Sequence, residues 1–250
     1  GLDTDYGKIP QCVKAGRSVP EAVLEFNKRI IGATAPHCVA FKPNLAFYES
    51  LGTEGLRVLE KTVEHIRLNH PGQFVIADAK RGDIGNTARM YAKSYFETFD
   101  FDAVTLSPYM GSETVTPFLE YPGKFAIVVA LSSNPTSYDF QDALKDGKPL
   151  YRVVMEKMME VSTPENMMFV VGATKADKFK EIRSFCPDNF FLVPGVGAQG
   201  GSAGEVIANG ANPKGGLLIN SSRGIIYASS GKDFEEAAAF AAARTARIRL

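Results

Sequence analysis

Four charged residues in the first third of the chain have the types and spacing that proton transfer at carbon would need. Asp78, Lys80 and Asp83 lie within residues 77–84 (ADAKRGDI), and Lys42 ends an earlier apolar run. Side chains two positions apart in a strand point to the same face, so Asp78 and Lys80 share a side if this segment is a strand. We expect Lys42, at the end of the preceding strand, to reach the same space.

The alternating signs of this cluster indicate how it could work. Carboxylates favour the protonated form of the lysines, and the lysines favour ionised carboxylates. A lysine held as an ammonium ion can protonate a developing carbanion, and a carboxylate beside a substrate carboxylate disfavours that ground state. The cluster therefore predicts decarboxylation or proton transfer at carbon. A structural salt-bridge network is the alternative, and the presence of Lys42 and Asp83 beside the Asp-x-Lys pair favours catalysis.

A second candidate site lies near the C-terminus. Residues 193–202 (VPGVGAQGGS) include Gly197 and Gly200, where the backbone can approach an anion, and the next helix adds the positive end of its dipole. Arg223, one strand later, can bind phosphate in bidentate fashion. Together they predict a phosphate site.

The elements that must position these residues are short apolar runs that alternate with amphipathic stretches. Buried parallel strands are expected at residues 39–42, 74–80, 103–107, 125–132, 167–173, 190–196 and 216–220, with residues 1–3 as an eighth. Helical spacing occurs over residues 56–66 and 151–161, and further helices should start near Pro20, Asn86, Ser112, Asp177, Ser202 and Phe234.

This alternation predicts an α/β fold, a TIM (β/α)8 barrel that forms one domain over residues 1–250. Eight units in 250 residues average about 31 residues each, the size of a βα unit. The chain opens in what reads as the end of a strand, so we expect the first strand to be truncated. A doubly wound open sheet is the alternative. Polar residues fall where barrel strands end, the habitual place of an active site: Asp3, Lys42, Asp78, Lys80, Ser133, Gln199 and Arg223.

Residues 132–149 are read as an eighteen-residue loop without secondary structure. Loops of this length are often lids, and Ser133 at its start could donate a hydrogen bond to a substrate ring. A tolerated surface insertion is the alternative.

Composition narrows the classes of function. The 28 basic and 28 acidic residues balance, which argues against nucleic acid as a partner. No apolar run is long enough to span a bilayer, so no membrane partner is expected. Three scattered cysteines fit a reduced, cytoplasmic protein better than a disulfide frame.

Residues 77–87 (ADAKRGDIGNT) resemble the signature of the orotidine 5'-phosphate decarboxylase family, in the branch that carries DAKRGDI. The resemblance extends through residues 1–5 (GLDTD), 41–44 (FKPN), 132–135 (SSNP) and 194–201 to Arg223. It implies a cofactor-free TIM barrel, a carbon–carbon lyase that converts orotidine 5'-monophosphate (OMP) to uridine 5'-monophosphate (UMP) and CO2 in pyrimidine biosynthesis.

The resemblance also implies a role for each matched residue. Lys80 would protonate C6 of the pyrimidine, Asp78 would lie against the departing carboxylate, and Lys42 would bridge Asp78 and the ribose. Asp3 would hold a ribose hydroxyl and Ser133 would contact the pyrimidine. The phosphate would be bound by Gln199 and Arg223, with Gly197 and Gly200 in the glycine-rich segment, and no metal is expected. Asp83 and Thr87 would enter the neighbouring subunit's site, which makes the enzyme a homodimer.

Two other functions remain open from the residues. A metal-dependent sugar-phosphate decarboxylase or aldolase would place an acidic ligand where this chain has Lys42, and a lysine there disfavours Mg²⁺. A catalytically silent phosphate-binding barrel would keep Arg223 but would have no need for Asp78, Lys80 and Asp83 together.

Overall fold

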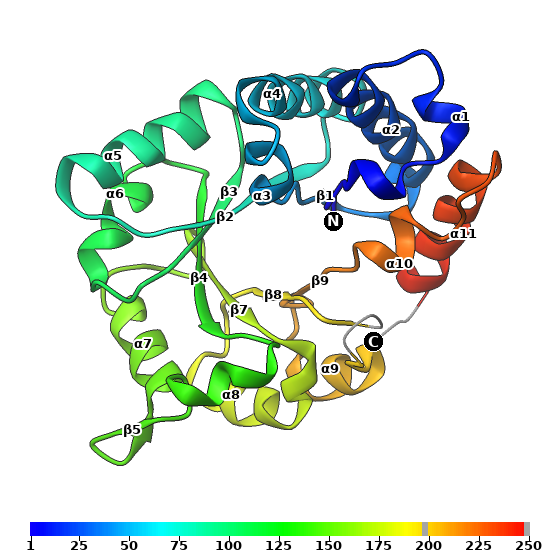
Figure 1. The fold of residues 1–250 in the computed structure, drawn as a ribbon. Coiled ribbons are helices and arrows are strands. Elements are labelled where there is room, and N and C mark those ends of the chain that lie inside the picture. Colours follow the sequence, from blue (N-terminus) through cyan, green and yellow to red (C-terminus); the bar gives the residue numbers. More distant parts are fainter. Residues whose placement is uncertain (197–199, 248–250) are drawn as a thin grey trace. The chain divides into compact units, whose positions relative to one another are not determined.

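The computed structural model describes residues 1–196 and 200–247 (Figure 1). Within them the chain forms two compact units. The first comprises residues 1–79, 99–101 and 222–247, and the second comprises residues 80–98 and 102–221 without the undescribed stretch.

The first unit is mainly helical. Its α-helices are α1 (Gln11–Lys14), α2 (Val19–Thr34), α3 (Leu45–Glu49), α4 (Gly52–Asn69), α10 (Arg223–Ile226) and α11 (Phe234–Ala246). Strand β1 (Ala40–Phe41) pairs in parallel with β2 (Phe74–Arg81), whose first six residues belong to this unit. The strand expected over residues 1–3 is reduced to a parallel bridge between Leu2 and Pro43.

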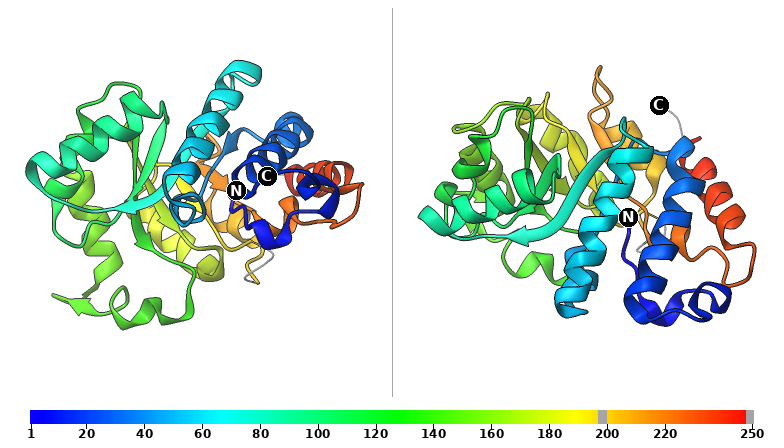
Figure 2. Two further views of the ribbon diagram at one scale, coloured as in Figure 1. Left: turned by 45° about the horizontal axis from the view of Figure 1, so that its top comes forward. Right: turned by 90° about the horizontal axis from the view of Figure 1, so that it is seen from above.

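Helix α2 shows why these residues form these elements. Ser18 and Glu21 make a capping box at its start, and Pro20 lies in the first turn, where no backbone N–H is needed. Phe26 and Ile30, one turn apart, are buried. Helix α2 packs against α11, and the two helices lie side by side in the views of Figures 1 and 2.

The second unit carries the remaining strands of the main sheet. These are β3 (Ala103–Leu106), β4 (Phe125–Leu131), β7 (Met167–Val171), β8 (Phe191–Val193) and β9 (Leu217–Ile219), each parallel to the next. Its helices are α5 (Gly85–Lys93), which continues as a π-helix (Ser94–Thr98), α6 (Thr116–Leu119), α7 (Leu150–Met159), α8 (Phe179–Phe185) and α9 (Ala203–Gly210).

All seven apolar runs predicted after residue 3 contain strands, with slightly different bounds. The strand order in the sheet is β1-β2-β3-β4-β7-β8-β9, so the strands follow the chain without a reversal. A doubly wound sheet needs a point at which the strand order reverses. The sequential order therefore favours the predicted barrel topology over the open-sheet alternative.

The prediction of an unstructured loop over residues 132–149 was wrong. The segment contains a 3-10 helix (Pro135–Asp139) and an antiparallel hairpin of β5 (Leu144–Lys145) and β6 (Lys148–Pro149). Two-residue strands with exposed side chains carry no alternation of apolar and polar positions, so the sequence pattern could not reveal them. Its action as a lid stays a prediction.

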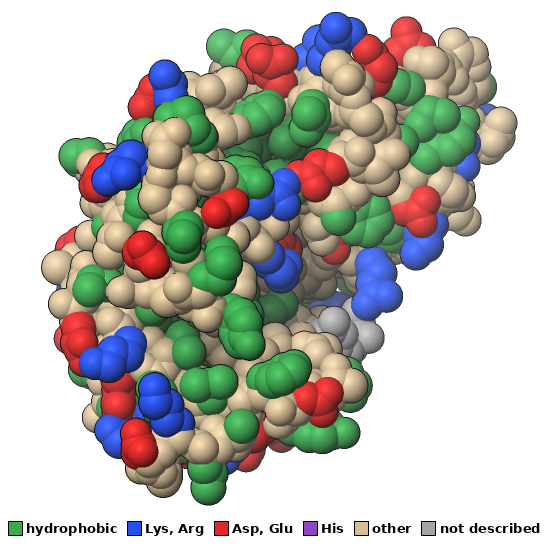
Figure 3. Space-filling model, turned by 60° about the vertical axis from the view of Figure 1, so that its left-hand side comes forward, with side chains coloured by type: hydrophobic (Ala, Val, Ile, Leu, Met, Phe, Trp, Pro, Cys, Tyr) green, Lys and Arg blue, Asp and Glu red, His purple; other side chains and the backbone are tan. Residues whose placement is uncertain are grey.

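Surface charge agrees with the balanced composition. On the face in Figure 3, acidic and basic side chains are interspersed, so that face shows no field of a single sign. No helix in the described part of the chain is long and apolar enough to cross a membrane.

Candidate active site

Lys42 and Asp78 form a buried ion pair in the first unit. Lys42 directly follows β1 and Asp78 lies in β2, and the backbone N–H of Asp78 donates to the carbonyl of Pro43 at 3.0 Å. The Lys42 Nζ lies 2.6 Å from Asp78 Oδ2, and the two side chains are only 7% and 10% exposed. The predicted convergence of these two residues is confirmed.

The burial of this pair has an energetic consequence. An ammonium and a carboxylate removed from water each carry a desolvation cost of several kcal/mol, which their mutual attraction must offset. Such a pair can keep a positive and a negative charge fixed beside a substrate without rearrangement during the reaction.

Lys80 has an unusual backbone. Its φ is +48°, in the left-handed region, although it lies inside strand β2. Its backbone N–H donates to Thr105 Oγ1 at 2.9 Å, and its side chain is exposed. This conformation costs a non-glycine residue about 1–2 kcal/mol and recurs at active sites. The regular strand alternation that we used to place its side chain therefore does not extend to this residue.

The chain after Lys80 runs against the end of β3. The N–H of Ser107 donates to the carbonyl of Arg81 at 2.7 Å. A Cβ on Gly82 would lie 2.8 Å from the Ser107 carbonyl oxygen, so only glycine fits there. Beyond this contact, the Asp83 carboxylate accepts from the N–H of Ile84 at 2.8 Å, and Thr87 is exposed in the first turn of α5.

Asp3 is held by its backbone next to the first strand bridge. Its Oδ1 atom is buried and has no hydrogen-bond partner among the described residues. Its carbonyl accepts from the Tyr227 hydroxyl at 2.9 Å. A buried carboxylate oxygen with an unused acceptor site is suited to a hydroxyl group of a ligand.

Ser133 is fixed by close backbone packing in the second unit. A Cβ on Gly172 would lie 2.7 Å from both the Cα and the N of Ser133. The Thr174 hydroxyl donates to the Ser133 carbonyl at 3.1 Å. The side-chain oxygen of Gln141 accepts from the N–H of Ser132 at 2.8 Å, which fixes the preceding residue. The backbone of Ser133 is therefore held by several contacts where the chain leaves β4.

The predicted phosphate residues are described in part. Gly200 has a φ of +86°, which favours glycine, and Ser202 caps α9 through its hydroxyl, which accepts from the N–H of Glu205 at 3.3 Å. Arg223 begins α10 and is exposed. Gly197 and Gln199 lie outside the described residues. The predicted site residues divide between the two units: Asp3, Lys42, Asp78 and Arg223 in the first, and Lys80, Asp83, Thr87, Ser133 and Gly200 in the second.

Three supporting residues were not predicted from the sequence: Gln141, Gly172 and Tyr227. Tyr227 lies four residues after Arg223, and this helical spacing was the one signal that could have drawn attention to it. The contacts of Gln141 and Gly172 depend on tertiary packing, and no local pattern indicates them.

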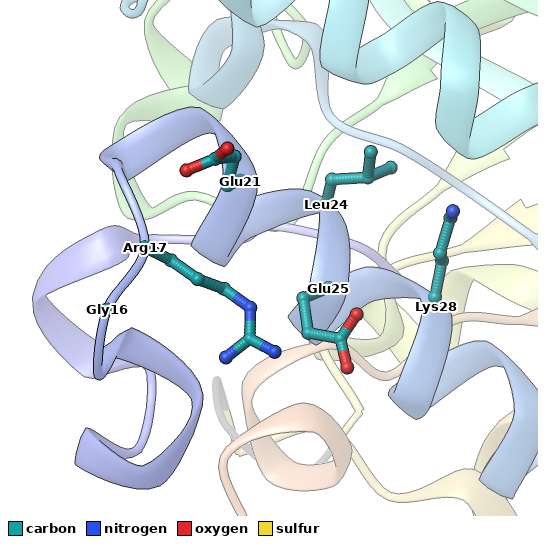
Figure 4. Close-up of a pocket in the computed structure, with 6 residues that line it drawn as sticks. All are labelled: Gly16, Arg17, Glu21, Leu24, Glu25 and Lys28. Carbon is teal, nitrogen blue, oxygen red and sulfur yellow. The ribbon is translucent and has the colours of Figure 1, made fainter.

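Elsewhere, a shallow pocket of about 240 Å³ lies beside the start of α2 and contains none of the predicted site residues (Figure 4). It is lined by Gly16, Arg17, Glu21, Leu24, Glu25 and Lys28. Within the described ranges, no three His, Cys, Asp or Glu side chains gather in the way that a metal ion would need.

Comparison with known proteins gives one consistent result. Residues 21–239 match the model of the orotidine 5'-phosphate decarboxylase / HUMPS family. The orotidine 5'-phosphate decarboxylase of Bacteroides fragilis is 53% identical over 245 residues, which cover 97% of this chain and 88% of that protein. The enzyme of the same name from Parabacteroides distasonis is 54% identical, with 97% of this chain and 86% of that protein covered.

Solved structures of other proteins give the same result. The structure of Leishmania donovani OMP decarboxylase matches with a TM-score of 0.81 at 34% identity, over 95% of this chain and 92% of that one. Leishmania donovani UMP synthase matches with a TM-score of 0.79 at 38% identity over 89% of this chain, which spans 51% of that chain's length. With the sequential strand order, these similarities establish the predicted TIM-barrel-type α/β fold. By its sequence and by its fold, the chain belongs to the orotidine 5'-phosphate decarboxylase / HUMPS family.

Proposed function

We propose that this protein is an orotidine 5'-phosphate decarboxylase, a carbon–carbon lyase that converts OMP to UMP and CO2 in pyrimidine biosynthesis without a cofactor. Two relatives that are 53% and 54% identical to it over 97% of this chain carry this name. The observation that carries the proposal is the buried Lys42–Asp78 pair, with 2.6 Å between Nζ and Oδ2. It puts an ammonium where the metal-dependent alternative needs an acidic ligand.

The proposed chemistry needs only side chains. The bond from C6 of the pyrimidine to the carboxylate breaks, CO2 leaves, and the electron pair stays on C6. The Lys80 ammonium donates a proton to that carbon and afterwards regains one from solvent. Asp78 lies against the departing carboxylate and disfavours the charged ground state, while Lys42 bridges Asp78 and the ribose.

The remaining residues bind the nucleotide. Asp3 accepts from a ribose hydroxyl, for which its buried, unpartnered Oδ1 is suited. Ser133 contacts the pyrimidine. Arg223, Gln199 and the glycine-rich segment with Gly197 and Gly200 bind the phosphate.

We further propose a homodimer in which Asp83 and Thr87 enter the partner's site. Apolar side chains are exposed close to these residues in the sequence and on the loop after β3. Ile84 is 46% exposed, Met90 52% and Tyr109 85%. Large exposed apolar side chains are common at contact surfaces, and these support the proposed dimer.

Two further proposals concern the cellular compartment of the protein and its division into domains. The cysteines Cys12, Cys38 and Cys186 are all free thiols, which supports a reducing compartment such as the cytoplasm. We propose that residues 1–250 form a single domain.

A spectrophotometric assay tests the function. The purified protein should change the absorbance of added OMP at an undiminished rate in the presence of a chelator. Loss of turnover with the chelator would favour the metal-dependent alternative. UMP binding in calorimetry without any turnover of OMP would favour a silent phosphate-binding barrel.

A further inference from the structure

Tyr227 makes two hydrogen bonds to the segment that carries Asp3. Its hydroxyl donates to the Asp3 carbonyl at 2.9 Å and accepts from the Asp5 N–H at 2.7 Å. One phenol thereby fixes the backbone on both sides of Thr4. These contacts join parts of the chain more than 220 residues apart.

The same tyrosine ends the short helix that begins with Arg223. Tyr227 caps α10, and its own N–H donates to the Arg223 carbonyl at 3.3 Å. The helix is a single turn, so this hydrogen bond joins the two residues at its ends directly. Tyr227 is thus bonded to the residue proposed for the phosphate and to the residue proposed for the ribose.

The ring of Tyr227 is fixed by its surroundings. It stacks on Phe26 with ring centroids 6.0 Å apart, and the Lys8 ammonium lies 5.6 Å from its centroid. Burial is the largest cause that raises the pKa of Tyr227, to about 12, so the hydroxyl keeps its proton and remains a donor well into the alkaline range.

The segment is also held from its other side. The Thr4 hydroxyl donates to Asn27 Oδ1 at 2.6 Å, and the Asn27 amide donates to Tyr48 and Thr62 at 3.0 and 3.1 Å. Asn27 is fully buried, and its three partners in this network are also buried. Thr4 is thereby immobilised, and Tyr227 sets the position of the residues on either side of it.

We propose that Tyr227 is a positioning residue that fixes the spacing between the ribose-binding Asp3 and the phosphate-binding Arg223. The inference rests on the proposed function of those two residues. No contact of Tyr227 with the pyrimidine or the reacting carbon is proposed. It acts through the two residues it joins. Binding of phosphate should therefore change the protection of the Asp5 backbone amide.

A double-mutant cycle measures this coupling. Calorimetry gives the Kd of UMP for the wild type, Tyr227→Phe, Asp3→Ala and the double variant. Tyr227→Phe keeps the ring and its stacking but loses both hydrogen bonds, and we expect it to raise the Kd about tenfold. In the Asp3→Ala background the same change should raise it less than about threefold. A tenfold increase in both backgrounds would overturn the proposal.

Tyr121→Phe is the matched control. The Tyr121 hydroxyl donates to Glu97 at 2.9 Å on the surface of the second unit, and neither residue is among those proposed for the site. Its loss should change the Kd of UMP less than about twofold. An equal effect of the two tyrosine changes would show a general loss of stability and would also overturn the proposal.

Hydrogen exchange in the wild-type protein gives a readout that does not depend on any variant's folding. Inorganic phosphate alone should slow the exchange of the Asp5 amide, because that amide donates to Tyr227. Unchanged exchange at saturating phosphate would contradict the coupling. A wild type that neither binds UMP nor turns over OMP would refute the proposed function instead, so the two failures are distinguishable.

Discussion

The Lys42 ammonium and the Asp78 carboxylate lie 2.6 Å apart with at most a tenth of either side chain exposed. One charge comes from the residue after β1 and the other from within β2. The neighbouring backbones are joined as well, through the bridge between Asn44 and Asp78. The pair is therefore part of the sheet, and its geometry is set before any substrate binds.

Removal of one partner should destabilise the fold strongly. Lys42→Met leaves the Asp78 carboxylate buried without its counter-ion, and we expect a loss of about 3–5 kcal/mol in the free energy of unfolding. The double variant Lys42→Met/Asp78→Leu should recover most of that loss while staying inactive. Denaturant unfolding measures all three chains.

An exposed ion pair is the control for this prediction. Lys157 and Glu160 lie 2.9 Å apart with 64% and 61% of their side chains exposed. Lys157→Met should cost less than about 1 kcal/mol. Equal losses at the buried and the exposed pair would show that burial of Lys42 and Asp78 does not matter energetically.

The left-handed backbone of Lys80 predicts an unusual order of stability between two inactive variants. Glycine adopts φ near +48° without strain, whereas alanine keeps the strain. Lys80→Gly should therefore be more stable than Lys80→Ala by about 1 kcal/mol in denaturant unfolding. Both should lower kcat by far more than tenfold and still bind UMP.

The neighbouring Ala79 supplies the matched control, since it does not have a positive φ. There, glycine should lower the stability by about 0.5–1 kcal/mol. If glycine lowered the free energy of unfolding at both positions, the positive φ of Lys80 would not be destabilising. A fall in kcat of less than tenfold for Lys80→Ala would contradict the donor role.

The sequence predicted what depends on local pattern. Every residue of β7 is buried, which is why its continuous apolar run could be recognised. Lys42 and Asp78 could be paired in advance because parallel strands end at one edge of a sheet. The φ of Lys80 was not predictable, since strand periodicity assumes an extended backbone. Contacts such as Tyr227 with Asp3 depend on tertiary packing between distant segments, for which no local pattern exists.

Gly172 should be required for activity more than for the fold. In Gly172→Ala the new Cβ would lie 2.7 Å from the Ser133 backbone, so either that backbone or the end of β7 must shift. We expect kcat/KM for OMP to fall at least tenfold. Steady-state kinetics measure this, with a thermal scan to follow stability.

Gly32 is the matched glycine outside the site. It lies within α2, and a Cβ there would meet no atom within 4 Å. Gly32→Ala should raise stability by about 0.5–1 kcal/mol and leave kinetics unchanged. Normal kcat/KM in Gly172→Ala would show that the Ser133 backbone can shift without loss of activity. The proposed contact of Ser133 with the pyrimidine would then lose its basis.

The shared site predicts complementation between two inactive chains. Lys80→Ala and Asp83→Ala homodimers should each be inactive, but in a mixed dimer one of the two sites receives both intact residues. After subunit exchange, about a quarter of the wild-type activity should return, since half of the dimers are mixed and each has one intact site. Exchange demonstrated by mass spectrometry, with no recovered activity, would argue against a site shared between subunits.

Alkaline pH should destabilise the protein through Cys186. Burial raises the pKa of this thiol to about 11, whereas an unfolded chain loses the proton near pH 8.5. Above that pH the unfolded state binds fewer protons than the folded state, so the free energy of unfolding falls as the pH rises toward 11. Denaturant unfolding between pH 8 and 11 should show a shallower fall for Cys186→Ala than for the wild type.

Cys12→Ala removes an exposed thiol and should follow the wild-type curve. Parallel curves for the wild type and Cys186→Ala would mean that the buried thiol does not govern the alkaline loss of stability.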